Sequence, residues 1–257
     1  MFFPFGFGIY LAALAFALMS VAVSAVQHYA ATTLYRPQGP GACGGKLVFL
    51  HGMNDTGAMF RKCLQDITHE RFEEELRNAG IEVLYPDAPL SNDTEFGHCW
   101  TQVFQEIPHK PSNTEPLEIS ENSYHTVLKP LLANLSETVG LDRVVVAGYS
   151  MGGTMASMLL RHVPSLGGLA VMKGNVYQDE PLWLSVGSDS PHMLLMAAAE
   201  DHCVLQEDVH SIANGMEFAG INVSVHVSPV RHYLDGDEIM DLAEWVISLL
   251  SSDCPAT

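Results

Sequence analysis

The chain has 257 residues, which is enough for one α/β domain with a full hydrophobic core and an additional N-terminal segment. It carries 12 Lys and Arg against 30 Asp and Glu, a formal net charge of −18. This acidic excess argues against nucleic acid and anionic membrane surfaces as partners, because both are bound by clustered positive charge. The charge by itself says nothing about a reaction.

Residues 1–26 are almost wholly apolar and carry no charged side chain. They are typical of a signal peptide, with a small-residue cleavage site at 23–25, and they are also just long enough to span a bilayer as an anchor. The missing basic n-region weakens the first interpretation, and a wrongly assigned start codon is a third. Because the first basic residues follow the run, an anchor would favour a cytoplasmic catalytic domain. We therefore expect a secreted or membrane-anchored protein, with the cytoplasmic orientation left open.

After a turn-rich entry at 27–45, residues 46–252 have the pattern of a single domain. Apolar runs predict strands at 46–50, 81–85, 144–146, 169–172, 193–198 and 222–227. Helical spacing predicts helices at 57–78, 124–139 (with Pro130 as a kink or as its true start), 154–160, 207–219 and 237–250. Residues 91–117 are expected to form a long loop over the functional site. Strands that alternate with helices indicate an α/β protein with a mostly parallel sheet covered on both faces.

The stretch Gly148-Tyr149-Ser150-Met151-Gly152 stands between the strand at 144–146 and the helix at 154–160. Strand, G-x-S-x-G and helix form a nucleophile elbow, a turn so sharp that the residues flanking the serine must be small. The turn lifts the serine hydroxyl above the sheet and points a helix N-terminus at it, where backbone N–H groups can meet a developing anion. The pattern predicts Ser150 as a nucleophile rather than an ordinary serine in a Gly-rich turn.

A serine hydroxyl needs a base within hydrogen-bond reach, and the base needs an acid to orient it. After an elbow of this kind the chain order is Ser, acid, His, each on a loop at the carboxyl end of a strand. Asp201 follows the strand at 193–198 and His232 follows the last strand, so we predict Ser150, Asp201 and His232 as the catalytic residues. Five other residues are less suitable as the base or the acid. His202 adjoins Asp201, and Glu200 is still close to the strand end. His226 lies within a strand, and His210 and Asp208 lie within a helix.

The loop at 51–57 is expected to supply a second oxyanion N–H beside that of Met151. His51 precedes the nucleophile in the chain, so we interpret it as a support for this loop rather than as a base. The five cysteines form no C-x-x-C pair, and no His, Cys or carboxylate cluster has metal-ligand spacing. Since no Gly-rich phosphate loop opens a helix either, we expect no metal and no cofactor. The sequence leaves open whether the cysteines form disulfides or remain free thiols.

The motifs FLHGMNDTG, LYPDAP, GYSMGG, the Asp201 loop and RHYL together resemble the acyl-protein thioesterase/lysophospholipase/carboxylesterase family of α/β-hydrolases. GYSMGG with the Trp100 region and VLQEDVHS resembles its lysophospholipase-like branch, and the similarity covers roughly residues 30–250. The resemblance implies an α/β-hydrolase fold without a large lid domain, a Ser150–Asp201–His232 triad, and an oxyanion hole from the backbone of Met53 and Met151. It also implies hydrolysis of acyl thioesters or esters without a cofactor, on an acylated protein, a lysophospholipid or a small ester.

The chain departs from this family at three places. Asn54 stands where the family usually has Gly, and Asn is the residue that best replaces Gly in left-handed backbone. The approach to Asp201 lacks the family's His-Gly pair, and residues 1–26 are not part of the family domain.

Five apolar residues near the predicted site are candidates for an acyl pocket, with ordinary core packing as the alternative: Met53, Met59, Trp100, Phe104 and Met151. A catalytically silent, membrane-tethered binding protein with a hydrolase fold is the other interpretation of the whole chain, because a fold does not guarantee chemistry.

Overall fold

The computed structural model describes residues 44–90, 97–101, 118–177 and 179–251. Residues 1–26, most of the entry at 27–45 and most of the predicted loop at 91–117 lie outside the described residues, as does Phe104. Over the part that is described, no helix has the length and apolar character needed to cross a membrane.

The core of the fold is a parallel sheet of six strands in the described residues, in the order β2-β1-β3-β4-β5-β6. In chain order the strands are β1 (Gly45–Leu50), β2 (Ile81–Leu84), β3 (Val144–Tyr149), β4 (Gly168–Met172), β5 (His192–Ala198) and β6 (Val223–Ser228). Every pairing between neighbouring strands is parallel. The carboxyl ends of these strands therefore lie along one edge, where open α/β sheets place their ligands.

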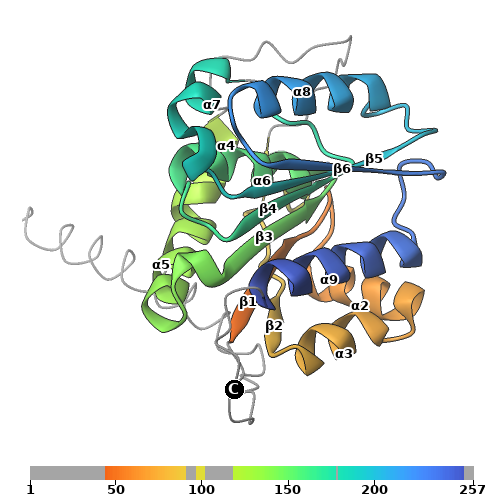
Figure 1. Cartoon of the computed structure of the whole chain (residues 1–257). Helices are drawn as coiled ribbons and strands as arrows, with labels where there is room; N and C mark the ends of the chain where they lie inside the picture. The colour runs from red at the N-terminus through yellow and green to blue at the C-terminus, as the bar shows by residue number, and fades with distance from the viewer. Residues whose placement is uncertain (1–43, 91–96, 102–117, 178, 252–257) are drawn as a thin grey trace, which may run out of the picture. The chain divides into compact units, whose positions relative to one another are not determined.

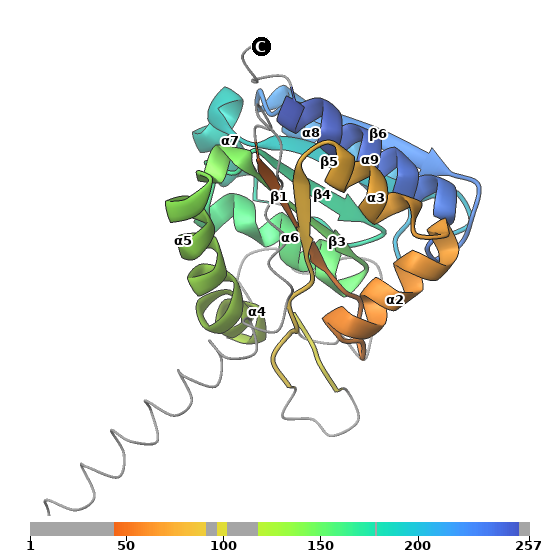
Figure 2. The same ribbon diagram turned by 90° about the horizontal axis from the view of Figure 1, so that it is seen from below.

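Helices cover both faces of this sheet (Figure 1; Figure 2). One face carries α2 (Gly57–Thr68), α3 (Arg71–Asn78) and α9 (Gly236–Ser251), and the other carries α4 (Glu118–Ser123), α5 (Lys129–Thr138), α6 (Met151–His162), α7 (Glu180–Val186) and α8 (Gln206–Phe218). Successive strand residues point to opposite faces, so Val145 enters one core while Val144 and Val146 enter the other. The parallel sheet with two covered faces is confirmed.

The helix predicted at 57–78 is wrong as a single element, because the chain forms α2 and α3 with a break between them. His69 and Glu70 both have left-handed backbone, with φ of 52° and 65°. The Glu70 N–H donates to the Gln65 carbonyl at 2.9 Å, which closes the end of α2. Neither residue is Gly or Pro, so the sequence contains no breaker at this point.

The helix predicted at 124–139 begins earlier and is interrupted. A π-helical turn, Tyr124–Leu128, separates α4 from α5, and the Lys129 N–H reaches back five residues to the Tyr124 carbonyl. Pro130 lies in the first turn of α5, directly after residues that are already helical, because Leu128 and Lys129 both have right-handed backbone. The alternative in which Pro130 marks the true start of the helix is therefore wrong: helical backbone runs from 118 to 138, and a π turn interrupts it just before the proline.

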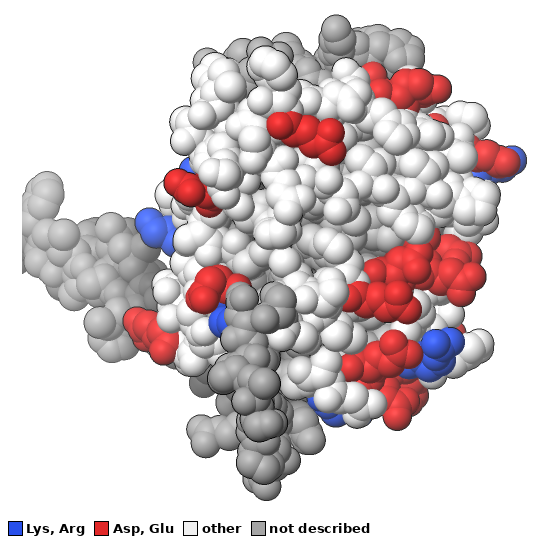
Figure 3. All heavy atoms as spheres, viewed as in Figure 1, with Lys and Arg blue, Asp and Glu red and all other residues white. Residues whose placement is uncertain are grey.

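Acidic side chains gather on the surface over α9 (Figure 3). Over the α2–α3 pair they lie beside basic ones, and Arg61, Lys62 and Arg71 form ion pairs there. On α9 the exposed acidic residues are Asp237, Asp241 and Glu244. This surface is unfavourable for polyanions and attracts cations, as expected from the net charge of −18.

Candidate active site

Ser150 lies in the sharp turn between β3 and α6. Its backbone has φ 53° and ψ −117°, a conformation that a non-glycine residue rarely adopts. The turn is held because the Ser150 N–H donates to the Met172 carbonyl at 2.8 Å, while its own carbonyl accepts the Thr154 N–H at 3.0 Å. Strained backbone fixed in this way aims the hydroxyl away from the sheet, as the elbow motif predicts.

The two glycines of the motif are required by space. A Cβ on Gly148 would lie 2.1 Å from the Gly152 carbonyl oxygen, and a Cβ on Gly152 would lie 2.4 Å from the Leu50 carbonyl oxygen. The start of α6 therefore packs directly on the end of β1. This contact places the loop that follows β1 beside the serine.

Ser150, His232 and Asp201 form one hydrogen-bonded chain. Ser150 Oγ lies 2.9 Å from His232 Nε2, and His232 Nδ1 lies 2.7 Å from Asp201 Oδ2. An ionised carboxylate can only accept, so Nδ1 carries the proton of a neutral imidazole and Nε2 accepts the serine hydroxyl. The structure thus brings the three predicted residues together from three separate loops.

The Asp201 carboxylate is fully buried and oriented by its own loop. Its second oxygen, Oδ1, accepts the backbone N–H of Cys203 at 2.7 Å and that of Val204 at 3.2 Å. The imidazole is more accessible, with a quarter of the His232 side chain exposed. Buried acid and accessible base are the arrangement that a proton-transfer chain open to substrate requires.

The backbone carbonyls of His232 and of the residue after it are held by groups that the sequence analysis did not identify. The Tyr149 hydroxyl donates to the His232 carbonyl at 2.9 Å, and burial raises the pKa of Tyr149 to about 12, so the phenol stays a donor at any physiological pH. The buried Lys173 ammonium donates to the Tyr233 carbonyl and to Glu238, each at 2.5 Å. No local sequence pattern marks Lys173 and Glu238 as partners, since they are 65 residues apart.

The loop at 51–57 lies against the nucleophile. A Cβ on Gly52 would be 3.8 Å from Ser150 Cβ, and Met53 follows directly. Asn54 has φ 65°, the left-handed backbone expected for a residue that replaces glycine. Met151 is the first residue of α6, so its N–H has no intrahelical acceptor.

His51 uses both ring nitrogens on backbone groups. Nδ1 donates to the Gly52 carbonyl at 2.6 Å, and Nε2 accepts the Ala88 N–H at 3.1 Å. Burial lowers the pKa of His51, which keeps the ring neutral and preserves its acceptor. These contacts agree with the interpretation of His51 as a support for the loop.

The candidate acyl-pocket residues have different surroundings. Met53 and Met59 are exposed, whereas Trp100 is fully buried, packs in the core and has its ring centroid 5.3 Å from that of His51. Trp100 therefore packs in the core against a residue of the loop at 51–57. Met151 is half-buried at the start of α6.

The alternative bases and acids have partners elsewhere or project into solvent. His226 Nε2 lies 3.3 Å from Asp241 Oδ2, and His210 Nε2 lies 3.3 Å from Gln206 Nε2. Glu200 Oε2 lies 3.3 Å from Arg231 Nε. His202 is exposed, and Asp208 is in the first turn of α8.

Cys203 is a neighbour of the site that the sequence spacing did not reveal. Ligand atoms of Asp201, Cys203 and His232 all lie within 4.8 Å of one another. Partial burial and the nearby Asp201 raise the pKa of the Cys203 thiol, so it is protonated at neutral pH. A thiol in this state is a weak nucleophile, which leaves Ser150 as the better candidate.

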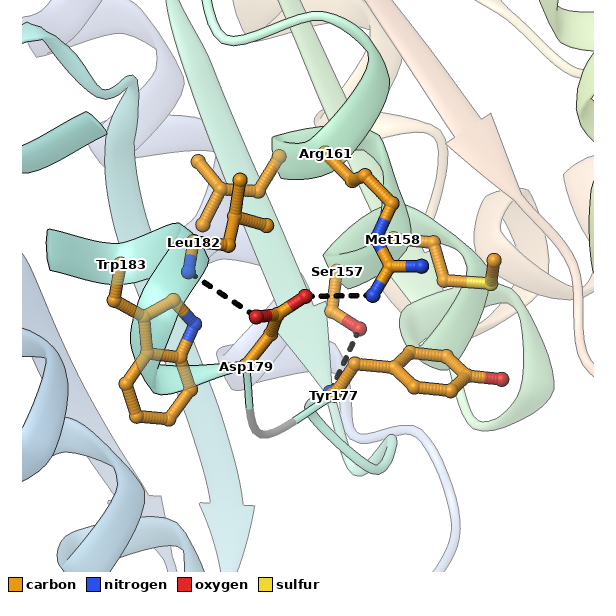
Figure 4. A pocket seen from close by; sticks show the side chains of 8 residues that line it. Ser157, Met158, Arg161, Tyr177, Asp179, Leu182 and Trp183 are labelled. Carbon is orange, nitrogen blue, oxygen red and sulfur yellow. Dashed lines mark hydrogen bonds and ion pairs between the residues drawn. The ribbon is translucent and has the colours of Figure 1, made fainter. Parts of the chain in front are cut away.

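A hollow between α6 and α7 lies apart from this group (Figure 4). At its edge Asp179 accepts the Leu182 N–H at 3.1 Å, as the N-cap of α7, and pairs with Arg161 of α6 at 2.6 Å. Because these polar groups satisfy one another, we assign them the structural role of fixing α7 against α6.

A parallel sheet with a serine elbow, and with an acid and a histidine on loops at its carboxyl edge, defines the α/β-hydrolase class. The chain belongs to the alpha/beta hydrolase fold family, whose model matches residues 46–211.

The resemblance expected from the motifs is confirmed by the relatives. The chain is 23% identical over 223 residues to the Mus musculus protein "Lysophospholipase-like protein 1", covering 83% of this chain and 90% of that protein. The structure of Arabidopsis thaliana SOBER1 has a TM-score of 0.58 and 22% identity, covering 80% of this chain and 99% of that one. Zea mays acyl-protein thioesterase 2 has a TM-score of 0.62 and 19% identity, covering 84% and 97%. At these identities the structural likeness establishes the fold.

Proposed function

We propose that the protein is a serine hydrolase that cleaves acyl thioesters or carboxylic esters through an acyl-enzyme on Ser150. The observation that carries this proposal is the hydrogen-bonded chain from the Ser150 hydroxyl through His232 to the buried Asp201 carboxylate. The relatives support the same reaction class, since one is named as an acyl-protein thioesterase and another, from Bacillus cereus, as a carboxylesterase.

The reaction begins when His232 Nε2 takes the proton of Ser150 as the hydroxyl oxygen attacks the acyl carbonyl. Asp201 holds the imidazole in the required tautomer and stabilises the imidazolium that forms. The backbone N–H groups of Met151 and Met53 receive the developing oxyanion, each contributing about 3–4 kcal/mol. His232 then protonates the leaving thiolate or alkoxide, and in the second half activates the water that hydrolyses the acyl-enzyme.

An acyl substrate fits the apolar side chains on the loops that carry the site. Met53 lies in the proposed oxyanion loop, Leu205 follows the Asp201 loop and Tyr233 follows the base, and the exposed fractions of the three residues range from 36% to 53%. Large apolar side chains left in water at the mouth of a site offer a surface for a hydrocarbon chain. An acylated protein, a lysophospholipid and a small ester all present such a chain.

The test is labelling by a fluorophosphonate probe, which reacts only with an activated serine. The wild-type protein should be labelled, and Ser150→Ala should abolish labelling and lower kcat by about 10⁴- to 10⁶-fold. His232→Ala should cost about as much, because the two residues act as a unit. Ser185→Ala, which removes an exposed hydroxyl on α7, is the matched control and should behave like wild type.

A tenth of wild-type turnover in either Ser150→Ala or His232→Ala would overturn the triad. Complete absence of labelling in the wild type would instead favour a silent binding protein. Dialysis against EDTA should leave turnover unchanged, because no step of this mechanism uses a metal. A series of acyl thioesters and p-nitrophenyl esters of increasing chain length then identifies the preferred substrate.

A further inference from the structure

Three side chains of different chemistry meet at the acid–base end of the candidate triad. One ligand atom each from Asp201, Cys203 and His232 lies within 4.8 Å of the others. Carboxylate, thiolate and imidazole are the three ligand types that zinc accepts, commonly in a tetrahedral site completed by water. We propose that these residues form an inhibitory site for Zn²⁺ and similar thiophilic divalent cations. The inference rests on the proposed function, because it requires His232 to be the base.

The loop geometry leaves the correct atoms available to a metal ion. Asp201 Oδ1 is committed to the N–H groups of Cys203 and Val204, while Oδ2 faces only His232 Nδ1 among the described residues. Tetrahedral bonds of about 2.0–2.1 Å separate nitrogen and oxygen ligands by about 3.3 Å. The present separation of Nδ1 and Oδ2 is 2.7 Å, so a small rotation of the imidazole admits the ion between them.

The site is also reachable. Cys203 is exposed and a quarter of the His232 side chain is in contact with solvent, whereas Asp201 forms the buried floor. A cation arriving from solvent therefore meets the thiol and the imidazole first. The net charge of −18 raises the local concentration of cations around the molecule.

Binding changes the tautomer of the base. A metal ion on Nδ1 displaces the proton that Nδ1 donates to Asp201, and the single proton of the neutral ring then resides on Nε2. Nε2 becomes a donor and can no longer accept the proton of Ser150, so the acyl-transfer step stops. The Cys203 thiol gives its proton to solvent on coordination. The ion's two positive charges are then balanced by one thiolate and one carboxylate.

The experiment titrates the intact protein with buffered Zn²⁺ in the absence of thiol reductants, and follows both ester hydrolysis and zinc bound at equilibrium dialysis. One bound zinc should accompany inhibition, and EDTA should restore activity. Cys203→Ser is assayed against its own metal-free rate. Its inhibition should need at least roughly 10- to 100-fold more zinc than that of wild type, because even the loss of a supporting contact to a metal ligand weakens metal binding by that factor. Cys63→Ser, which removes another exposed cysteine, is the matched control and should keep wild-type sensitivity.

A second readout is independent of activity. Co²⁺ in place of zinc should produce a thiolate-to-cobalt charge-transfer band in the wild type and in Cys63→Ser, and none in Cys203→Ser. The proposal is overturned by a wild-type enzyme that binds no zinc, or by a Cys203→Ser variant as sensitive as wild type. A protein that binds cobalt through Cys203 but is never labelled by fluorophosphonate would remove the proposed function and retain the metal site. An active, labelled protein without the charge-transfer band would retain the proposed function and remove the metal site.

Discussion

Lys173→Met should destabilise the protein strongly, because it leaves the Glu238 carboxylate buried without its ion-pair partner. The two side chains are 0% and 2% exposed, and Lys173 Nζ lies 2.5 Å from Glu238 Oε2. Removing one member of a buried pair costs about 3–5 kcal/mol. Glu238 keeps two weaker donors, the Ser228 hydroxyl and the Asp235 N–H, so the lower end of this range applies.

A loss of about 3 kcal/mol corresponds to a fall in Tm of roughly 6–12 °C for a domain of this size. Urea unfolding followed by tryptophan fluorescence measures the free energy directly. The double variant Lys173→Met/Glu238→Gln should recover most of the loss, because it removes the unpaired charge while keeping an acceptor for Ser228. Lys62→Met, which breaks the exposed pair with Asp66, is the matched control and should cost about 0.3–0.5 kcal/mol.

Lys173→Met should also lower turnover. Lys173 donates to the Tyr233 carbonyl, next to His232, so its loss frees the loop that carries the base. We expect kcat to fall more than KM rises in Lys173→Met. A variant within about 1 kcal/mol of wild type, below the range for a broken buried pair, would refute the reasoning. So would a double variant no more stable than the single one.

Three further outcomes are expected. Tyr149→Phe removes the bond to the His232 carbonyl and should lower the free energy of unfolding by about 1 kcal/mol, with kcat reduced more than KM is changed; an unaltered kcat would contradict this role. Burial lowers the pKa of His51 below 6.5, so the unfolded chain binds its proton more readily, and stability should decrease as the pH falls through 6.5 toward the folded pKa. In His51→Gln the pH dependence of urea unfolding should be shallower, and an identical slope would assign the effect elsewhere. Asn54 begins an N-x-T sequon beside Met53, and it should carry no glycan in active protein even if residues 1–26 direct the domain into the secretory lumen. In the lumen Asn92 should be the first site to be glycosylated. Peptide masses after amidase treatment measure both, and full occupancy at Asn54 in active protein would mean that the loop at 51–57 lies away from the site.

The sequence by itself determined the parts of this protein that depend on local chemistry. Continuous apolar runs and helical spacing predicted the parallel sheet with two covered faces, because strands buried on both faces are apolar throughout and helices buried on one side repeat their apolar residues with a period of 3.6. The elbow around Ser150 needs small residues at fixed offsets, so a single short motif was enough to locate it. Chain order then selected Asp201 and His232, since parallel strands bring their carboxyl ends to one edge.

Only the tertiary structure decided features that depend on contacts between distant residues. The left-handed break at His69 and Glu70 involves residues that normally continue a helix, and no local signal marks it. Lys173 and Glu238 pair because a strand end and a helix start meet in the fold, and Trp100 is fully buried with its ring beside that of His51, a residue of another loop. The thiol of Cys203 likewise lies near His232 because two loops that are distant in the sequence meet at the Asp201 carboxylate. The residue spacing within either loop does not predict this contact.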